Sequence, residues 1–88
     1  MQKPQSIELT LSELNPDDEA IVVEIRAEGF MKQRLYDLGL VPETHVKVLM
    51  RSPLGDPMAI EARGTVIALR REDASQIVVR NNSVVKNG

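Results

Sequence analysis

The sequence predicts a mainly β fold, a small β-barrel of five to six short strands with one α-helix. Its apolar residues come in short runs that alternate with polar ones, which is the period of half-buried strands. Glycines and prolines fall at the breaks between these runs, where turns are expected. With one Phe and one Tyr in the chain, the core must be filled by Val, Ile and Leu, which suits the small interior of such a barrel. Its 88 residues make a single domain.

The first third of the chain predicts two strands joined by a turn. Residues 7–11 alternate between apolar and polar side chains, as a short half-buried strand does. A polar cluster follows at 12–18, with one helical turn expected before its proline. The β-branched run 20–26 is the second strand, with Val22 on its outward face. The opposite face carries Ile21, Val23 and Ile25.

A change of period predicts the α-helix over about residues 28–38. Met31, Leu35 and Leu38 recur at helical spacing and form one apolar stripe. Gly39 supplies the left-handed residue that ends many helices, and Leu40 is placed to fold back onto the stripe.

The next segment predicts a corner, a strand and a hairpin loop. Residues 41–44 form a turn with Pro42 in its second position. In the strand that follows, Val46, Val48 and Met50 alternate with Lys47, Leu49 and Arg51. This phase leaves Leu49 outward. Two prolines and a glycine at 53–57 form the hairpin loop, because proline cannot donate to a strand ladder.

The rest of the chain predicts the return strands. Met58, Ile60 and Ala62 face inward, as do Ile67 and Leu69 farther on. Between them, Gly64 marks a bend or bulge of the kind a barrel corner needs. A short helical turn is expected near 72–75, before a closing strand at 77–80. We therefore expect the domain to span 7–80, between flexible tails at 1–6 and 81–88.

Several functional classes are disfavoured by composition. The chain has no cysteine, so it has neither disulfides nor a thiol nucleophile, and its start lacks the apolar segment of a leader peptide. A net charge of −2 and two aromatic residues argue against nucleic-acid binding. His45 is the single histidine, with no nucleophile motif beside it. The acidic runs lack the spacing of a cation loop. We expect no enzyme activity, no cofactor and no metal site, which leaves protein binding.

One ordered set of motifs carries a family resemblance. It consists of Arg34-Leu35, Leu38-Gly39-Leu40, Pro42, Pro53, Gly55-Asp56-Pro57, Gly64 and Ala68-Leu69-Arg70. In order and spacing this set resembles the ferrous iron transport protein A (FeoA) family over roughly residues 7–80. One departure is Glu43, where the family usually has glycine. Glutamate at that position favours a type I over a type II turn.

The resemblance implies an SH3-like barrel in the cytoplasm and a non-catalytic role in the transport of a transition metal ion. The implied partner is the cytoplasmic part of the ferrous-iron transporter FeoB, a GTP-hydrolysing permease that the protein would dock on and modulate. No nucleic acid and no direct membrane insertion are expected, while weak self-association is left open. Because the helix end and the hairpin loop project from the barrel, we predict partner contacts at Arg34, Tyr36, Leu54 and Asp56.

A second family offers an alternative. Metal-dependent repressors of the diphtheria toxin repressor type carry a similar barrel at their C-terminus. The sequence shows no helix-turn-helix and no metal-ligand helices before the barrel, so we do not expect a full repressor. The alternative is a stand-alone SH3-like protein-interaction module related to that C-terminal domain.

Overall fold

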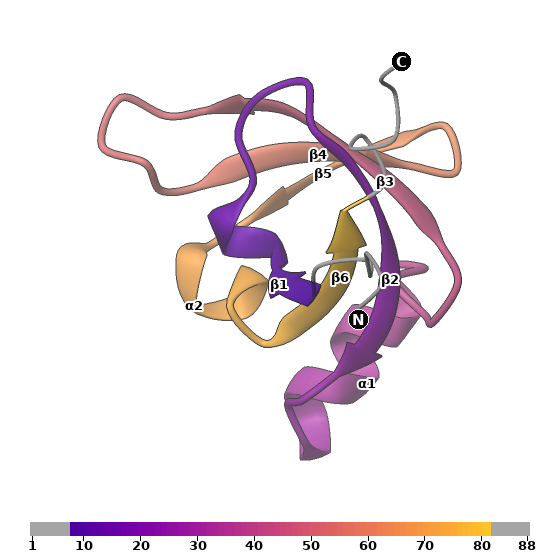
Figure 1. Ribbon diagram of the computed structural model, residues 1–88. Helices are drawn as coiled ribbons and strands as arrows, with labels where there is room; N and C mark the ends of the chain where they lie inside the picture. The colour runs from indigo at the N-terminus through magenta and orange to yellow at the C-terminus, as the bar shows by residue number, and fades with distance from the viewer. Residues whose placement is uncertain (1–7, 82–88) are drawn as a thin grey trace, which may run out of the picture.

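The computed structural model describes residues 8–81, which form one antiparallel sheet with three short helical segments (Figure 1). In chain order the elements are β1 (Glu8–Thr10), the 3-10 helix η1 (Leu11–Glu13), β2 (Glu19–Ile25), α1 (Gly29–Asp37), β3 (His45–Arg51), β4 (Met58–Ala62), β5 (Thr65–Leu69), α2 (Arg71–Ala74) and β6 (Ile77–Asn81). The predicted helix, hairpin loop and helical turn all occur close to their expected positions. The tails were predicted at 1–6 and 81–88, but Asn81 belongs to β6 and ends it. Residues 1–6 and 82–88 lie outside the described residues.

The six strands follow the order β1-β6-β2-β3-β4-β5, and every neighbouring pair is antiparallel. The sheet curves around one apolar core (Figure 1), to which β2, β3, β4, β5 and β6 each contribute fully or nearly fully buried side chains. The mainly β fold with a small enclosed core is confirmed. Within residues 8–81, no helix is long and apolar enough to cross a membrane.

A β-bulge in β2 overturns the predicted outward position of Val22. The register of β2 against β6 shifts between Val22 and Glu24, which inserts one extra residue into the strand. An inserted residue exchanges the two faces of everything beyond it. Ala20 and Val22 before the bulge and Ile25 after it therefore share the buried face. Val22 is fully buried, against the prediction, whereas Ile21 and Val23 are only half-buried.

A second bulge has the same effect on β3. Its register against β4 shifts between Val48 and Met50. Val46 and Val48 are fully buried as predicted, but Met50 is 55% exposed and does not share their face. Leu49 is exposed, as predicted.

The end of α1 is a left-handed glycine turn. Gly39 has φ +95° and donates its N–H to the Tyr36 carbonyl at 2.9 Å, and the Leu40 N–H reaches the Leu35 carbonyl at 3.0 Å. Leu35 and Leu40 are fully buried, so the predicted fold-back is confirmed. Leu38 is exposed and leaves the predicted stripe, because the helix proper ends at Asp37 and the chain turns at Leu38.

Two turns differ from expectation. The Thr44 N–H bonds to the Val41 carbonyl at 3.2 Å across a turn in which Glu43 has φ +77°. A positive φ at the third position is the signature of a type II turn, so the type I expectation was wrong. The bend or bulge expected at Gly64 is a two-residue hairpin turn, in which both Arg63 and Gly64 have positive φ.

Candidate partner-binding surface

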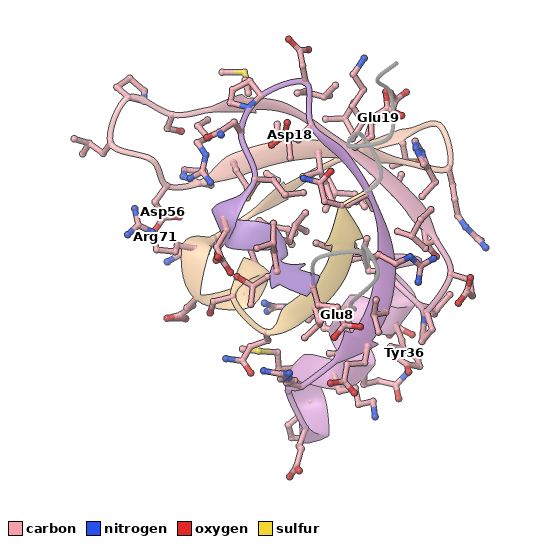
Figure 2. All side chains as sticks on the ribbon, viewed as in Figure 1. Glu8, Asp18, Glu19, Tyr36, Asp56 and Arg71 are labelled. Atoms are coloured by element: carbon pink, nitrogen blue, oxygen red, sulfur yellow. The ribbon has the colours of Figure 1, made fainter. Side chains whose placement is uncertain are left out.

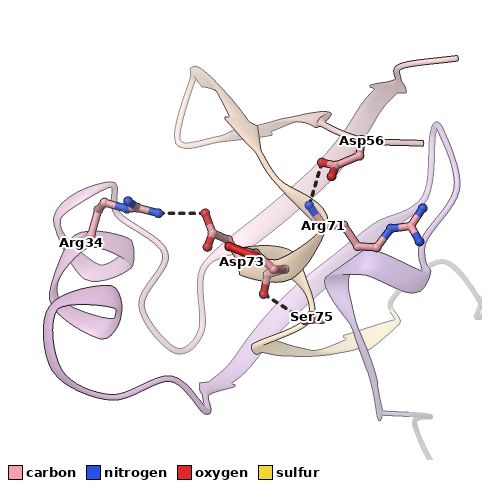
Figure 3. A network of polar contacts seen from close by, with 6 residues as sticks. Arg34, Asp56, Arg71, Asp73 and Ser75 are labelled. Atoms are coloured by element: carbon pink, nitrogen blue, oxygen red, sulfur yellow. Dashed lines mark hydrogen bonds and ion pairs between the residues drawn. The ribbon is translucent and has the colours of Figure 1, made fainter. Parts of the chain in front are cut away.

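The β3–β4 hairpin loop is fastened to the start of α2. Asp56 Oδ1 accepts a hydrogen bond from the Arg71 backbone N–H at 2.9 Å (Figure 3). The Arg71 guanidinium also lies against Gly55, where an added Cβ atom would come within 3.0 Å of its Nη2. Gly55 has φ +86°, so both its backbone conformation and its lack of a side chain serve this close approach. The loop therefore has a defined position on the barrel.

The other side of α2 is fastened to α1. Arg34 Nη2 lies 2.8 Å from Asp73 Oδ2, and these two residues are 39 positions apart in the chain (Figure 3). The Asp73 side chain is 7% exposed, whereas the Arg34 side chain is 60% exposed. A charge-assisted hydrogen bond of this length holds the outer helix to the barrel and compensates the burial of the carboxylate.

The four predicted contact residues thus fall into two pairs with different surroundings. Arg34 and Asp56 are both engaged with α2, from α1 and from the hairpin loop. Tyr36 is 36% exposed and has Lys32 Nζ 5.6 Å from its ring centroid, and Leu54 is 88% exposed. Tyr36 lies on a different side of the molecule from Asp56 (Figure 2), so the four residues do not form one patch.

Three features were missed by sequence reasoning. Phe30 is 94% exposed, because it lies one residue before the apolar stripe of α1 and so points away from it. Val66 is 63% exposed on β5. The ion-pair role of Asp73 has no local signal, since its partner is on a distant helix. Phe30 had a readable signal in its helical phase, and Val66 had one in its alternation with the inward-facing Ile67 and Leu69.

Charged side chains elsewhere form small local pairs. Glu13 accepts hydrogen bonds from the Thr10 N–H at 2.8 Å and from the Thr10 hydroxyl at 3.0 Å. These bonds, the backbone one foremost, hold the pKa of the Glu13 carboxyl below its ordinary value. Glu19 and His45 make an exposed pair at 2.9 Å. Across residues 8–81, no three His, Cys, Asp or Glu side chains group as metal ligands would.

One protein family matches almost all of the residues that the structure describes. The FeoA domain family matches residues 9–81, from the second residue of β1 to the end of β6. The chain belongs to the FeoA domain family. A curated relative from Porphyromonas gingivalis, an Fe(2+) transport protein A/Fe(2+) transporter FeoB fusion protein, is 34% identical over 71 residues. That match covers 81% of this chain but only 8% of the relative's length.

Solved FeoA structures share the fold. The FeoA protein of Chlorobium tepidum is 37% identical, with a TM-score of 0.78 over 91% of this chain and 79% of that one. The zinc complex of Stenotrophomonas maltophilia FeoA, described as a procaryotic SH3 domain protein, is 32% identical, with a TM-score of 0.72 over 81% and 88% of the two chains. The expected SH3-like fold is confirmed.

The repressor likeness is one of fold. A manganese-dependent transcriptional repressor superposes with a TM-score of 0.80 on 90% of this chain and 44% of its own, at 19% identity. The sequence-based expectation that repressors carry a similar barrel is confirmed.

Proposed function

We propose that this FeoA-family chain is a small cytoplasmic accessory protein of bacterial ferrous-iron uptake that binds and modulates the FeoB GTPase-permease. The observation that carries the proposal is the fused relative, in which an FeoA part and FeoB belong to one polypeptide. In the proposed role the chain docks on the cytoplasmic part of the transporter and performs no catalysis itself.

Fusion supplies a physical argument for docking. A covalent link holds two modules at a high effective concentration, so even a weak contact between them is occupied. A separate chain that does the same work must supply binding energy from its own surface. The β3–β4 hairpin loop and α1 are both bonded to α2, and this order supports docking by a separate chain. An ordered surface loses less conformational entropy on binding than a mobile one.

Direct binding is the decisive measurement. The full chain is titrated calorimetrically against the soluble cytoplasmic domain of the cognate transporter, with and without guanine nucleotide. We expect saturable binding in at least one nucleotide state. Deletion of the gene should lower ferrous-iron uptake and re-expression should restore it. No binding in either state, together with unchanged uptake in the deletion strain, would reject the proposal.

A second candidate is a stand-alone SH3-like interaction module with no link to FeoB. The superposition with the manganese-dependent repressor favours it, because it shows that the same barrel occurs in proteins described as regulators. Under this alternative the transporter domain does not bind and iron uptake is unaffected by deletion. The absence of a large GTPase-permease gene beside this one would also favour it.

A further inference from the structure

β5 is an edge strand without the features that usually protect an edge. It is the last strand of the sheet order, paired on one side by β4 and running from the tight hairpin to α2 (Figure 1). Its sequence, Thr65-Val66-Ile67-Ala68-Leu69, has no charge, no proline and no register shift. Proteins commonly block exposed edges with such features. The opposite edge, β1, is only three residues long and includes Glu8.

The hairpin geometry fixes which backbone groups of β5 face outward. Ala62 pairs with Thr65 directly across the two-residue turn, as a hydrogen-bonded pair does. Hydrogen-bonded and non-bonded pairs then alternate along an antiparallel ladder. The N–H and C=O groups of Val66 and Ala68 therefore point away from β4. Outside the strand ladder, no hydrogen bond of the described chain engages either residue.

The outer face beside this edge is apolar around Ala68 and charged around Val66, where Lys47, Glu61 and Val66 form the next cross-strand row. Met50, Ala59 and Ala68 lie in one cross-strand row over β3, β4 and β5. These three side chains line a shallow hollow, together with Ser52, Pro57 and Met58. A strand added to β5 would point alternate side chains toward this face, and Val66 would lose much of its exposure. Backbone bonds would supply affinity and the hollow would supply specificity.

The basic residues at the two ends of β5 favour an acidic partner segment over a second copy of the chain. Arg63 precedes the strand and Arg70 follows it, and both are exposed. Antiparallel pairing of two copies centred on Ile67 would set Arg63 of one copy opposite Arg71 of the other, and like charges disfavour that pairing. Acidic residues on the incoming segment would instead meet opposite charge at both ends.

We propose that the β5 edge binds, by strand addition, an extended partner segment that is uncharged in the middle and acidic at both ends. The inference adds a docking surface to the proposed function. It rests on the proposed function, because that function identifies the protein that supplies the segment. Four backbone groups, those of Val66 and Ala68, make the contact.

The first test uses a short synthetic peptide in which valine and threonine alternate between glutamate pairs. Amide hydrogen exchange of the full chain is followed by NMR, and the peptide should slow exchange at Val66 and Ala68. Val66→Pro removes one outward N–H without removing a ladder bond, and should weaken peptide binding about ten-fold. Val66→Thr keeps that N–H and is the matched control. A peptide with lysine in place of glutamate should bind about ten-fold more weakly.

A second variant tests the proposal in case Val66→Pro fails to fold. Arg63→Glu combined with Arg70→Glu leaves every strand amide in place and should reverse the preference between the two peptides. Binding that is indifferent to peptide charge would overturn the proposal. So would protection of Val66 that rises with protein concentration without peptide, since a second copy would then be the occupant.

Titrating the transporter domain separates this inference from the proposed function. If that domain binds wild type and Val66→Pro equally, the β5 inference fails and the proposed function stands. If the peptide is bound at β5 while the transporter domain is not bound, the proposed function fails and the strand-addition site stands.

Discussion

Arg34 Nη2 and Asp73 Oδ2 lie 2.8 Å apart and join the outer helix α1 to the short helix α2. The pair is unequal, because the carboxylate is almost entirely buried and the guanidinium is more than half exposed. Removing the exposed partner therefore leaves a buried charge without its compensation, which costs more than the exposed contact alone is worth.

The first prediction concerns this asymmetry. Arg34→Ala should lower the free energy of unfolding by about 1–2 kcal/mol, because Asp73 loses its charge-assisted bond while remaining buried. Arg34→Ala combined with Asp73→Ala should cost less than the sum of the two single changes. Urea denaturation of the double-mutant cycle measures this coupling. Additive single losses would show that the two groups do not interact.

The second prediction concerns the strained turn at Glu43. Its φ of +77° lies in the left-handed region, which costs a residue with a side chain about 1–2 kcal/mol. Glu43→Gly removes that cost but adds the chain entropy of glycine, so the net gain should be about 0.5–1 kcal/mol. The thermal midpoint should rise by a few degrees. Glu43→Ala keeps the strain and is the control, and an equal gain in both variants would point to charge rather than backbone.

The set of elements was predictable from sequence because each depends on local patterns. Alternation gave the strands, the change of period gave α1, and the proline-rich loop was identified by its missing N–H groups. The predicted inward and outward positions in β2 and β3 were partly wrong, because each strand contains a bulge. A bulge adds one residue, and no residue type marks it in the sequence. The positive φ at Arg63 could not be predicted either, because arginine is not a residue type that favours tight hairpin turns.

The candidate site was only partly predictable, for a related reason. Arg34 and Asp56 could be chosen because they stand on projecting segments. Their partners on α2 lie 39 and 15 residues away, and no periodicity relates positions that far apart. Whether any of these residues meets a partner protein stays a prediction.

The third prediction concerns pH and the Glu13 carboxylate. The Thr10 N–H, and secondarily its hydroxyl, lower the pKa of Glu13 in the folded chain below its ordinary value of 4.5. A lowered folded pKa stabilises the fold above the unfolded pKa, and this contribution is lost as pH falls through the folded pKa. Wild type should therefore exceed Glu13→Gln in stability near neutral pH, and the two should converge in acid.

Denaturation curves over a pH series check this convergence. Thr10→Val provides the control, because it removes the hydroxyl bond and keeps the backbone N–H bond. The pH dependence should then be reduced but retained. A constant difference between wild type and Glu13→Gln at all pH values would contradict the assignment.

The fourth prediction concerns the anchor of the hairpin loop. Asp56→Ala removes the acceptor for the Arg71 N–H in the first turn of α2 and should cost about 1 kcal/mol. Asp56→Asn keeps a side-chain oxygen and should cost less. Chemical denaturation compares the two, and equal losses would mean that the charge rather than the hydrogen bond holds the loop.

The fifth prediction concerns Leu54, which should contribute to partner binding and not to the stability of the fold. This side chain is 88% exposed on a loop that Asp56 holds in place, so Leu54→Ser should change stability by less than about 0.5 kcal/mol. An apolar side chain that enters a partner's surface contributes about 1–2 kcal/mol, so the same change should weaken binding to the transporter domain about ten-fold. Phe30→Ser removes an equally exposed apolar side chain from α1 and is the matched control. A loss of affinity with Phe30→Ser but not with Leu54→Ser would move the contact from the loop to the helix.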